Sequence, residues 1–340
     1  MKKKILALAL ASAMALSLAA CGGQSAAPAA SSGSAAPAAS AASGSAAGKT
    51  YTVGVIQLVQ HAALDAATQG FKDALTQALG DKVSFDEQIA AGDSATCNTI
   101  VNAFVSKKVD LILANATPAL QAAAAATSEI PILGTSVTEY GVALSIDGFD
   151  GTVGGNISGT SDLAPLDQQA AMVTELVPDA KTAGILYCSG EPNSVYQADV
   201  VKAALESAGL AVNVYTFADS NDVASVTTTA CNECDVLYIP TDNTAASCTE
   251  AINNVAQPAG VPIVCGEEGL CKGCGIATLS IDYYELGRTT GEMAVKILTG
   301  ESDISTMPIE YYANPVKKYE ADRTAALNIT VPSDYVAIEG

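Results

Sequence analysis

The sequence predicts an α/β fold with two Rossmann-like lobes, each a mainly parallel sheet flanked by helices, joined by a hinge. Short runs rich in β-branched residues alternate with longer stretches that carry apolar residues at helical spacing. This alternation is typical of parallel sheets with helices on both faces. It is interrupted by a glycine-rich stretch, 148–159, and then begins again. About 290 residues follow the N-terminal region, which is more than a single hydrophobic core usually holds.

The first half of the folded region predicts the order β-α-β-α-β-α-β. Its first strand, Tyr51–Gln57, is rich in β-branched residues, and the stretch after it, 62–79, carries an apolar stripe of helical spacing. Further strands are predicted at Val83–Ala90, Leu111–Ala114 and Pro131–Ser136, and further helices at 94–107 and 118–127.

The glycine-rich stretch 148–159 precedes the second alternation, and we interpret it as a hinge rather than a dinucleotide-binding loop, since it follows no clear strand. Helices are predicted at 165–177, 193–208, 221–230, 244–257 and 283–299. Strands are predicted at Ala183–Cys188, Leu210–Phe217, Asp235–Pro240, Val261–Gly266 and Ile276–Ile281.

The N-terminal region has the pattern of a bacterial lipoprotein leader. Lys2–Lys4 are followed by an apolar run, Ile5–Leu18, which is too short to span a membrane convincingly. The small pair Ala19–Ala20 then precedes Cys21, and 22–48 are almost entirely Ala, Ser, Gly and Pro. Such a stretch cannot bury enough apolar surface to fold. An ordinary cleaved signal with a disordered tail is the alternative.

We therefore predict a signal peptide over 1–20, lipidation of Cys21, and a disordered tether over 21–48. The globular body would be exported and lipid-anchored to the outer face of the bacterial cytoplasmic membrane, at the cell surface or in the periplasm. The formal net charge of −20 argues against nucleic acid as a partner, because an acidic surface repels it.

The cysteines allow several interpretations. Beyond Cys21 there are eight, and Cys231/Cys234 and Cys271/Cys274 form two C-x-x-C pairs. The gap between the pairs is about twice the usual zinc-ribbon spacing, so we expect disulfides or free thiols rather than a metal site. We predict no metal, no cofactor and no enzyme activity, since the chain lacks the G-x-S-x-G, P-loop and H-E-x-x-H motifs and has one His, His61.

Polar residues that follow the predicted strands are candidate ligand-binding residues, because ligands bind open α/β sheets beyond the carboxyl ends of the strands. Polar residues at the end of the glycine-rich stretch are candidates as well. Amides, hydroxyls and carboxylates are all present among them. This combination suits a zwitterion, whose carboxylate needs donors and whose ammonium needs acceptors. The candidates are Gln57, Thr117, Pro118, Thr138, Ser161, Asp162, Glu191, Asn193, Ser194, Asp242, Asn243 and Glu268.

Two of these positions give a more specific prediction. Thr117 followed by Pro118 is typical of an N-cap with Pro at the first helical position, where free backbone N–H groups can bind a carboxylate. Asp242 directly follows an apolar strand, which favours a ligand role over a surface turn. The alternative for Thr117 and for other polar residues of this kind is that they only cap helices; these are Asn193, Ser194 and Asn243.

At these residues the chain resembles a known family, the ABC-transporter substrate-binding lipoproteins that include tryptophan- and tyrosine-transport binding proteins. The matching stretches are VGVIQLVQHAALDAATQGF (53–71), ATPALQAA (116–123), GGNISGTSD (154–162), EPNSVYQ (191–197), SNDV (220–223), PTDNTAAS (240–247) and IDYYELGRTTGEMAVKIL (281–298). Departures from the family pattern occur at 61–65, 137–140 and 267–271.

The resemblance implies a periplasmic binding protein-like I fold, of the type with three crossovers between lobes. The helix at 283–299 would return to the first lobe, and the tail would end in the second. The implied first lobe is 49–160 plus about 283–313, and the implied second lobe is 161–282 plus about 314–340.

The resemblance also implies a ligand, an amino acid that is often aromatic. Thr117 and the backbone at 117–119 would hold its carboxylate, and Asp242, with Glu191, its ammonium. The rest of the polar ring would be Asn193, Ser194, Ser161 and Asn243.

The predicted function is therefore that of an extracellular solute-binding lipoprotein of an ABC importer. It would act as a monomer, capture its ligand in the interlobe cleft and deliver it to the permease and ATPase subunits. Alternatives are a binder of a nucleoside, sugar or other small polar solute, a ligand-sensing receptor without transport, and a thiol–disulfide or metal protein that uses the C-x-x-C pairs.

Overall fold

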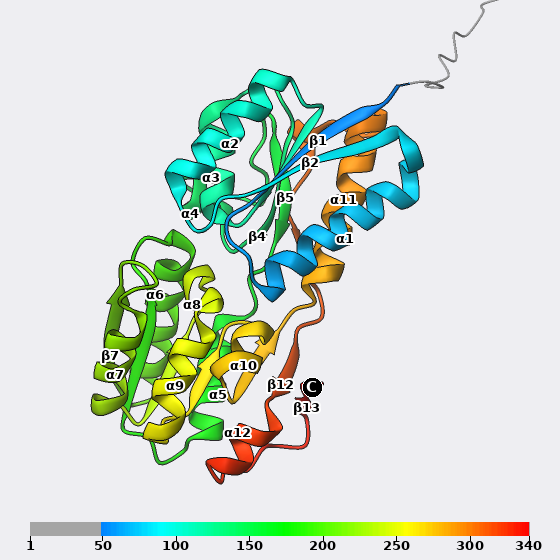
Figure 1. The fold of residues 1–340 in the computed structure, drawn as a ribbon. Helices are drawn as coiled ribbons and strands as arrows, with labels where there is room; N and C mark the ends of the chain where they lie inside the picture. Colours follow the sequence, from blue (N-terminus) through cyan, green and yellow to red (C-terminus); the bar gives the residue numbers. More distant parts are fainter. Residues whose placement is uncertain (1–48, 340) are drawn as a thin grey trace, which may run out of the picture. The chain divides into compact units, whose positions relative to one another are not determined.

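The computed structural model describes residues 49–339. The predicted signal peptide, the lipidated Cys21 and the whole predicted tether lie outside the described residues. Within residues 49–339 no helix combines the length and apolarity that a membrane crossing requires. The described residues form two sheets with flanking helices (Figure 1), which confirms the predicted fold class of two parallel-sheet α/β lobes.

The sheet of lobe 1 has the strand order β11-β5-β4-β3-β1-β2, and all its pairings are parallel. Its central strands are buried along almost their whole length, as expected for a parallel sheet covered on both faces. The strands are β1 (Tyr51–Gln57), β2 (Val83–Ile89), β3 (Leu111–Asn115), β4 (Ile132–Val137), β5 (Ile157–Ser161) and β11 (Glu310–Tyr311).

Helices cover both faces of this sheet (Figure 1). Successive side chains of a strand point to opposite faces, so Val55 packs with α1 and α11, whereas Ile56 packs with α2 and α3. The helices are α1 (Ala62–Leu79), α2 (Ser94–Lys107), α3 (Thr117–Ala126), α4 (Tyr140–Leu144) and α11 (Tyr283–Thr299), with short 3₁₀ turns η1 (Gly80–Lys82) and η2 (Ile304–Thr306).

Helices α1 and α11 approach each other closely through glycine. A Cβ at Gly287 would lie 2.0 Å from the carbonyl oxygen of Ala67, and a Cβ at Gly70 would lie 2.0 Å from that of Tyr284. Only glycine permits this backbone contact. The contact joins the helix that follows β1 to the helix that follows β10 (Ala277–Ser280) of the second lobe.

The sheet of lobe 2 has the order β13-β12-β10-β9-β8-β6-β7 and is parallel except where β12 pairs with β10. Helices α5 and α6 pack on one face, and α7, α9 and α10 on the other. The strands are β6 (Thr182–Cys188), β7 (Ala211–Phe217), β8 (Val236–Ile239), β9 (Ile263–Cys265), β10 (Ala277–Ser280), β12 (Val316–Tyr319) and β13 (Val336–Ala337). The helices are α5 (Leu166–Leu176), α6 (Pro192–Ser207), α7 (Val223–Glu233), α8 (Asn243–Ser247), α9 (Thr249–Ala259), α10 (Glu268–Cys274) and α12 (Ala321–Ala326).

The chain passes between the two sheets three times. It leaves the first sheet after β5, returns after β10 through α11, and leaves again after β11, which pairs with β5. The last described segments, β12, α12 and β13, belong to the second sheet and its flank.

Two sequence interpretations are corrected by the structure. The glycine-rich stretch 148–159 is not a free hinge, because its end forms part of strand β5. A Cβ at Gly159 would lie 2.1 Å from the Gly134 carbonyl oxygen and 2.4 Å from the Tyr140 hydroxyl, so this glycine serves close strand packing. The single helix predicted at 244–257 is two helices, α8 and α9, which meet at Cys248.

Candidate functional site

The candidate site lies where the carboxyl ends of the two parallel sheets meet. Two hydrogen bonds join the lobes there. The Nε2 of His61, after β1, lies 3.3 Å from the Oδ1 of Asn243, after β8, and the Nε2 of Gln197 lies 3.4 Å from the Oγ1 of Thr138, after β4. The arrangement matches the expected position of ligand sites in open α/β folds.

Two cavities lie at this interlobe boundary. One has a volume of about 370 Å³, and its lining includes Leu58, Asp93 and Pro118 from lobe 1 and Cys188, Glu191 and Thr244 from lobe 2. The other has about 350 Å³, and its lining includes Ala62, Ala63 and Ala66 from α1 and Glu267, Gly269 and Tyr283 beyond the second sheet. Both volumes fall in the range of about 300–1,000 Å³ usual for small-molecule sites.

The backbone is strained at two neighbouring strand ends of lobe 1. Ala116, after β3, has φ 91°, and Ser136, at the end of β4, has φ 53°, although neither is glycine. The two ends are joined by a hydrogen bond of 3.0 Å from the Ala116 N–H to the Thr135 carbonyl. Positive φ at such residues costs about 1–3 kcal/mol and concentrates at functional sites.

Helix α3 begins at this strained edge. Its N-cap is Ala116, without a side-chain cap, so the prediction of Thr117 as N-cap is one residue too late. The reason is the unusual φ of Ala116, which turns the chain into the helix earlier than a Thr-Pro pair indicates. The first helical hydrogen bond joins the Leu120 N–H to the Ala116 carbonyl. The N–H groups of Thr117 and Ala119 therefore precede the hydrogen-bonded part of the buried helix terminus.

Several buried polar atoms at the strand ends have no hydrogen-bond partner in the described part of the chain. A buried polar atom without a partner costs about 1–3 kcal/mol, so a group of them requires an explanation. Most are oxygen acceptors. Those close to strand ends are His61 Nδ1, Asn115 Oδ1, Ser136 Oγ, Asp162 Oδ1 and Asn193 Oδ1; a further one, Thr278 Oγ1, lies within β10.

Asp162 has a carboxyl group with one oxygen that lacks a hydrogen-bond partner among the described residues. It follows β5, and its side chain is 4% exposed. Oδ2 accepts a hydrogen bond of 2.9 Å from the Tyr283 hydroxyl at the start of α11, whereas Oδ1 has no partner among the described residues. Burial raises the pKa of Asp162 to about 6. No Lys or Arg of residues 49–339 forms an ion pair with it.

Asp242 is also buried, 1% exposed, but protein groups already bind its carboxylate. Oδ2 accepts hydrogen bonds from the Cys188 N–H and the Ser194 hydroxyl, each 2.7 Å, and Oδ1 accepts one of 2.7 Å from the Ala245 N–H as N-cap of α8. Burial, and next the neighbouring Glu191 carboxylate, raise the pKa of Asp242.

Glu191 is bound even more completely. Its Oε1 accepts from the N–H and hydroxyl of Thr244, each 2.8 Å. Its Oε2 accepts from the N–H of Asn243 at 3.0 Å, from the Asn243 amide at 2.7 Å and from the Asn193 amide at 3.2 Å. Glu191 thus fixes both asparagines within lobe 2, and Asn243 in turn reaches His61 of lobe 1.

Two further candidates, Gln57 and Ser161, serve contacts within lobe 1. The Gln57 amide donates to Asp65 at 2.6 Å, and its oxygen accepts from the Thr68 hydroxyl at 2.7 Å. The Ser161 hydroxyl donates to the carbonyl of Thr138 at 2.7 Å, which ties the start of the first crossover to the end of β4.

Glu268 is placed away from the buried polar cluster. It forms an ion pair with Lys318, and its side chain is 35% exposed. The preceding residue, Glu267, is 2% exposed and caps α10 through hydrogen bonds from the N–H groups of Gly269 and Leu270. Burial raises the pKa of Glu267 to about 7. Both Glu267 and Glu268 line the cavity of about 350 Å³, and Glu267 is the more buried of the two.

The candidates predicted from the sequence do not include Ser136, Tyr283 and Gln197. Tyr283 follows Asp282, the N-cap of α11, and this Asp after a strand was the available signal. The positive φ of Ser136 leaves no mark in the sequence. Gln197 lies one turn after Asn193, and that spacing could have placed both on one face of α6.

The cysteines in residues 49–339 are unpaired thiols. Among these residues no group of three or more His, Cys, Asp and Glu side chains has the arrangement of a metal site. Cys265 at the end of β9 and Cys271 and Cys274 of α10 are buried in the core of lobe 2.

Comparison with known proteins gives consistent matches. Residues 52–319 of this chain match the family described as ABC transporter substrate binding protein. A tyrosine-binding protein of Clostridioides difficile (strain R20291) is 37% identical over 267 residues, which cover 77% of this chain and 76% of the relative.

Solved structures show the same relationship. A Streptococcus pneumoniae ABC domain in complex with L-Trp is 31% identical, with a TM-score of 0.80, and the match covers 84% of this chain and 97% of the other. A conserved domain protein of Vibrio cholerae has 31% identity and a TM-score of 0.81 over 85% and 99% of the two chains.

A ligand-free, open substrate-binding protein with adhesive properties from Clostridium difficile is 36% identical but has a TM-score of only 0.64, over 85% and 100% of the two chains. The TM-score is therefore higher for the L-Trp complex than for the ligand-free, open structure, although the sequence identity is higher for the latter.

Proposed function

Because this chain belongs to the family of ABC transporter substrate-binding proteins, we propose that it captures an amino acid, most favourably an aromatic one, between its two lobes. The tyrosine-binding relative and the L-Trp complex support this class of ligand. The proposal requires binding and lobe closure only, and no bond is made or broken.

The observation that carries the proposal is the unpaired oxygen of Asp162. A buried carboxylate without a counter-ion is stabilised by a cation that brings N–H donors, and an ammonium group is such a cation. Asp242, Glu191 and Glu267 accept hydrogen bonds from protein donors, whereas Asp162 Oδ1 has none among the described residues. We therefore assign the ammonium to Asp162 rather than to Asp242 or Glu191.

The carboxylate of the ligand is assigned to the start of α3. The N–H groups of Thr117 and Ala119 and the partial positive charge of the helix terminus favour an anion there. The hydroxyl of Ser136, which lacks a partner among the described residues, is a further donor at the neighbouring strand end. Asn193 Oδ1, from lobe 2, is an additional acceptor for the ammonium, so the ligand would contact both lobes.

Contacts with both lobes give the ligand its effect on conformation. A ligand shifts an equilibrium between open and closed forms only as far as it binds one form better. A zwitterion held by Asp162 of lobe 1 and Asn193 of lobe 2 binds the closed form better. We propose that a membrane permease recognises this closed form, that an ATPase subunit powers transport, and that lipidated Cys21 and the tether keep the exported monomer near the membrane.

The test is a ligand screen followed by one substitution. We expect thermal shift with the twenty amino acids and several nucleosides and sugars to show stabilisation by L-Tyr or L-Trp. Asp162→Asn should then weaken calorimetric affinity by about 10- to 100-fold, since a hydrogen bond to a charged group contributes roughly 1.5–3 kcal/mol. Asp303→Asn, an exposed turn cap, is the matched control and should leave affinity unchanged.

Two outcomes would contradict the proposal at different levels. Stabilisation by a nucleoside or sugar, and by no amino acid, would replace the ligand class. Amino-acid binding that survives Asp162→Asn within threefold would retain the class and remove the ammonium assignment.

A further inference from the structure

Helix α10 has little stability of its own, yet it forms a wall of the interlobe cavity of about 350 Å³. It spans only Glu268–Cys274 and contains Gly269 and Gly273. Helices of this length are marginal on their own, and each interior glycine costs about 1 kcal/mol relative to alanine. The helix therefore depends on contacts outside itself for its position.

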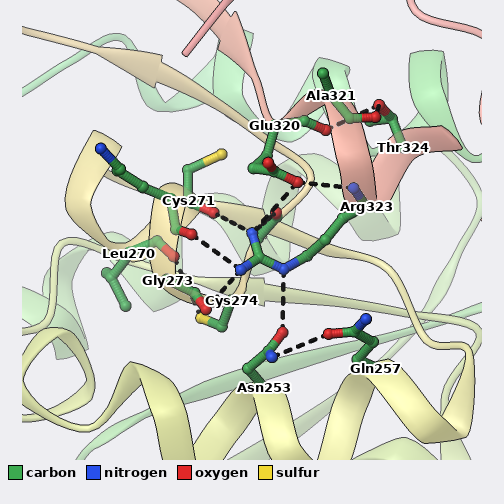
Figure 2. Close-up of polar contacts among 12 residues, drawn as sticks. Asn253, Gln257, Leu270, Cys271, Gly273, Cys274, Glu320, Ala321, Arg323 and Thr324 are labelled. Carbon is green, nitrogen blue, oxygen red and sulfur yellow. Dashed lines mark hydrogen bonds and ion pairs between the residues drawn. The ribbon is translucent and has the colours of Figure 1, made fainter. Parts of the chain in front are cut away.

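Arg323, from α12, supplies these contacts at the C-terminal end of α10. Figure 2 shows its guanidinium among the carbonyl groups of the last turn. Nη1 donates to the carbonyls of Cys271 at 3.1 Å and Gly275 at 3.2 Å, and Nη2 to those of Lys272 at 2.9 Å and Gly273 at 2.8 Å. The last carbonyls of a helix have no partner within it, and Arg323 supplies donors to those of Lys272 and Gly273. The Cys271 carbonyl also accepts a hydrogen bond of 2.9 Å from the Gly275 N–H.

The guanidinium is itself held in place. Its Nε donates to Asn253 Oδ1 of α9 at 3.0 Å, and Glu320 lies 3.6 Å from Nη1 (Figure 2). A planar fork with fixed neighbours can orient several carbonyls at once, which a flexible lysine cannot do. The positive charge also complements the negative end of the helix dipole.

The opposite end of α10 faces lobe 1. Glu267 caps it, and this residue and Gly269 line the cavity of about 350 Å³ together with Ala62 and Tyr283. A Cβ at Gly269 would lie 3.5 Å from the Ala62 Cβ of α1, so the first turn of α10 is directly against the other lobe.

We propose that Arg323 is a positioning residue for ligand capture: by fixing the carbonyl end of α10, it holds the first turn and Glu267 in the place where lobe 1 closes on them. Arg323 itself touches neither the cavity of about 350 Å³ nor Asp162, and it reaches α10 from the C-terminal arm that follows the third crossover. The inference rests on the proposed function in one respect, since ligand capture is measured as affinity for an amino acid.

The experiment compares full-length Arg323→Ala and Arg323→Lys with Arg288→Ala, which removes a surface arginine of α11. In the ligand-free protein, hydrogen exchange of the α10 amides should become at least tenfold faster in Arg323→Ala and less so in Arg323→Lys. Affinity for the amino acid found by the screen should fall about tenfold in Arg323→Ala and remain within twofold in Arg288→Ala.

A double-mutant cycle separates positioning from general stability. Arg323→Ala should change affinity by less than twofold when Glu267→Gln is already present, because the two residues act through one helix. Asn253→Ala, which removes only the Nε partner, provides a milder variant if Arg323→Ala does not fold, and it should show the same coupling with a smaller loss of affinity.

The outcomes distinguish the two proposals. Unchanged α10 exchange in Arg323→Ala, or full affinity with only a lower Tm, overturns the role of Arg323. Additive effects in the cycle also overturn it. A wild-type protein that binds no amino acid overturns the proposed function, and α10 exchange then still decides whether Arg323 fixes the helix.

Discussion

The carboxylates at the two sheet edges that meet at the candidate site differ in how many hydrogen bonds they accept from the protein. In lobe 2, Asp242 and Glu191 are saturated by hydrogen bonds from backbone and side-chain donors of their own lobe. In lobe 1, the carboxylate of Asp162 at the end of β5 has one oxygen without a partner among residues 49–339. A buried carboxylate is therefore not by itself a ligand group, and the supply of protein donors decides which one is free to bind.

The backbone shows the same contrast. Lobe 1 has positive φ at Ala116 and Ser136, at neighbouring strand ends of the cleft. Among the described residues of lobe 2, Asn328 is the one non-glycine residue with positive φ, and it is distant in sequence from the cleft residues. Lobe 1 contains the strained backbone and most of the buried polar atoms without partners, whereas most buried polar atoms of lobe 2 have hydrogen-bond partners. We infer that lobe 1 holds the charged groups of the ligand and that lobe 2 is a preformed wall that closes on it.

The largest effect is expected at the saturated carboxylate. Asp242→Ala should lower the free energy of unfolding by roughly 2–4 kcal/mol, because two buried N–H groups and the Ser194 hydroxyl lose their acceptor. Urea unfolding measures this. The exposed cap substitution Asp303→Ala should cost much less than Asp242→Ala.

Affinity is the second readout for Asp242→Ala. The folded variant should bind the amino acid within about threefold of wild type, a range of less than 1 kcal/mol. A stable variant that has lost binding would reverse the comparison and return the ammonium to Asp242.

The pH dependence of binding sharpens the assignment to Asp162. Since burial raises its pKa to about 6, the ligand-free carboxyl takes up a proton as the pH falls through that value. The protonated form lacks the charge that attracts ammonium, so affinity should fall about tenfold per pH unit below about pH 6. Calorimetry from about pH 5 to 8 tests this, and Asp162→Asn should flatten the lower part of the curve.

Ligand-free stability should change in the opposite sense. The folded pKa of Asp162 lies above its ordinary value of 3.8, so the folded state binds more protons between about pH 4 and 6, and the contribution of Asp162 to stability falls as the pH rises through that window. Asp162→Asn should therefore raise the ligand-free Tm at pH 7. A lower Tm would show that the ionised side chain of Asp162 stabilises the ligand-free fold, which would contradict its assignment to the ligand.

The smallest effects concern the strained backbone. Ser136→Gly relieves positive φ and removes a hydroxyl, so stability should rise by up to about 1 kcal/mol while affinity falls several-fold. Ala116→Gly is the matched variant, since it relieves strain without removing a polar group. It should raise stability similarly and leave affinity within twofold; equal affinity losses in both would assign the effect to the backbone and not to the hydroxyl.

Much of the fold is predictable from the sequence because parallel sheets have a strong pattern. Buried runs such as Leu111–Asn115 and Val236–Ile239 are short, apolar and regularly separated by helices. Strand β5 was missed because its residues, Ile157–Ser161, are small and polar and follow several glycines. Its burial comes from neighbours in the sheet, which no local window reveals.

The site was predictable as a region but not residue by residue. The strand-tip rule brought Asp242 and Asn193 to one edge, and Asp162 was a candidate from the end of the glycine-rich stretch. The sequence could not tell a saturated carboxylate from a free one, because the donors of Asp242 come from Cys188 and Ser194, about fifty positions away. Similarly, the sequence does not reveal that Glu267 is buried as the cap of α10 while Glu268, the next residue, is partly exposed.

A crystal structure of the amino-acid complex tests the central claim most directly. The account predicts the ligand nitrogen within about 3.2 Å of Asp162 Oδ1, a hydrogen-bond distance, with the ligand carboxylate at the N–H groups that open α3. A ligand nitrogen bound to Asp242 or Glu191, with Asp162 Oδ1 paired to a protein group, would contradict it.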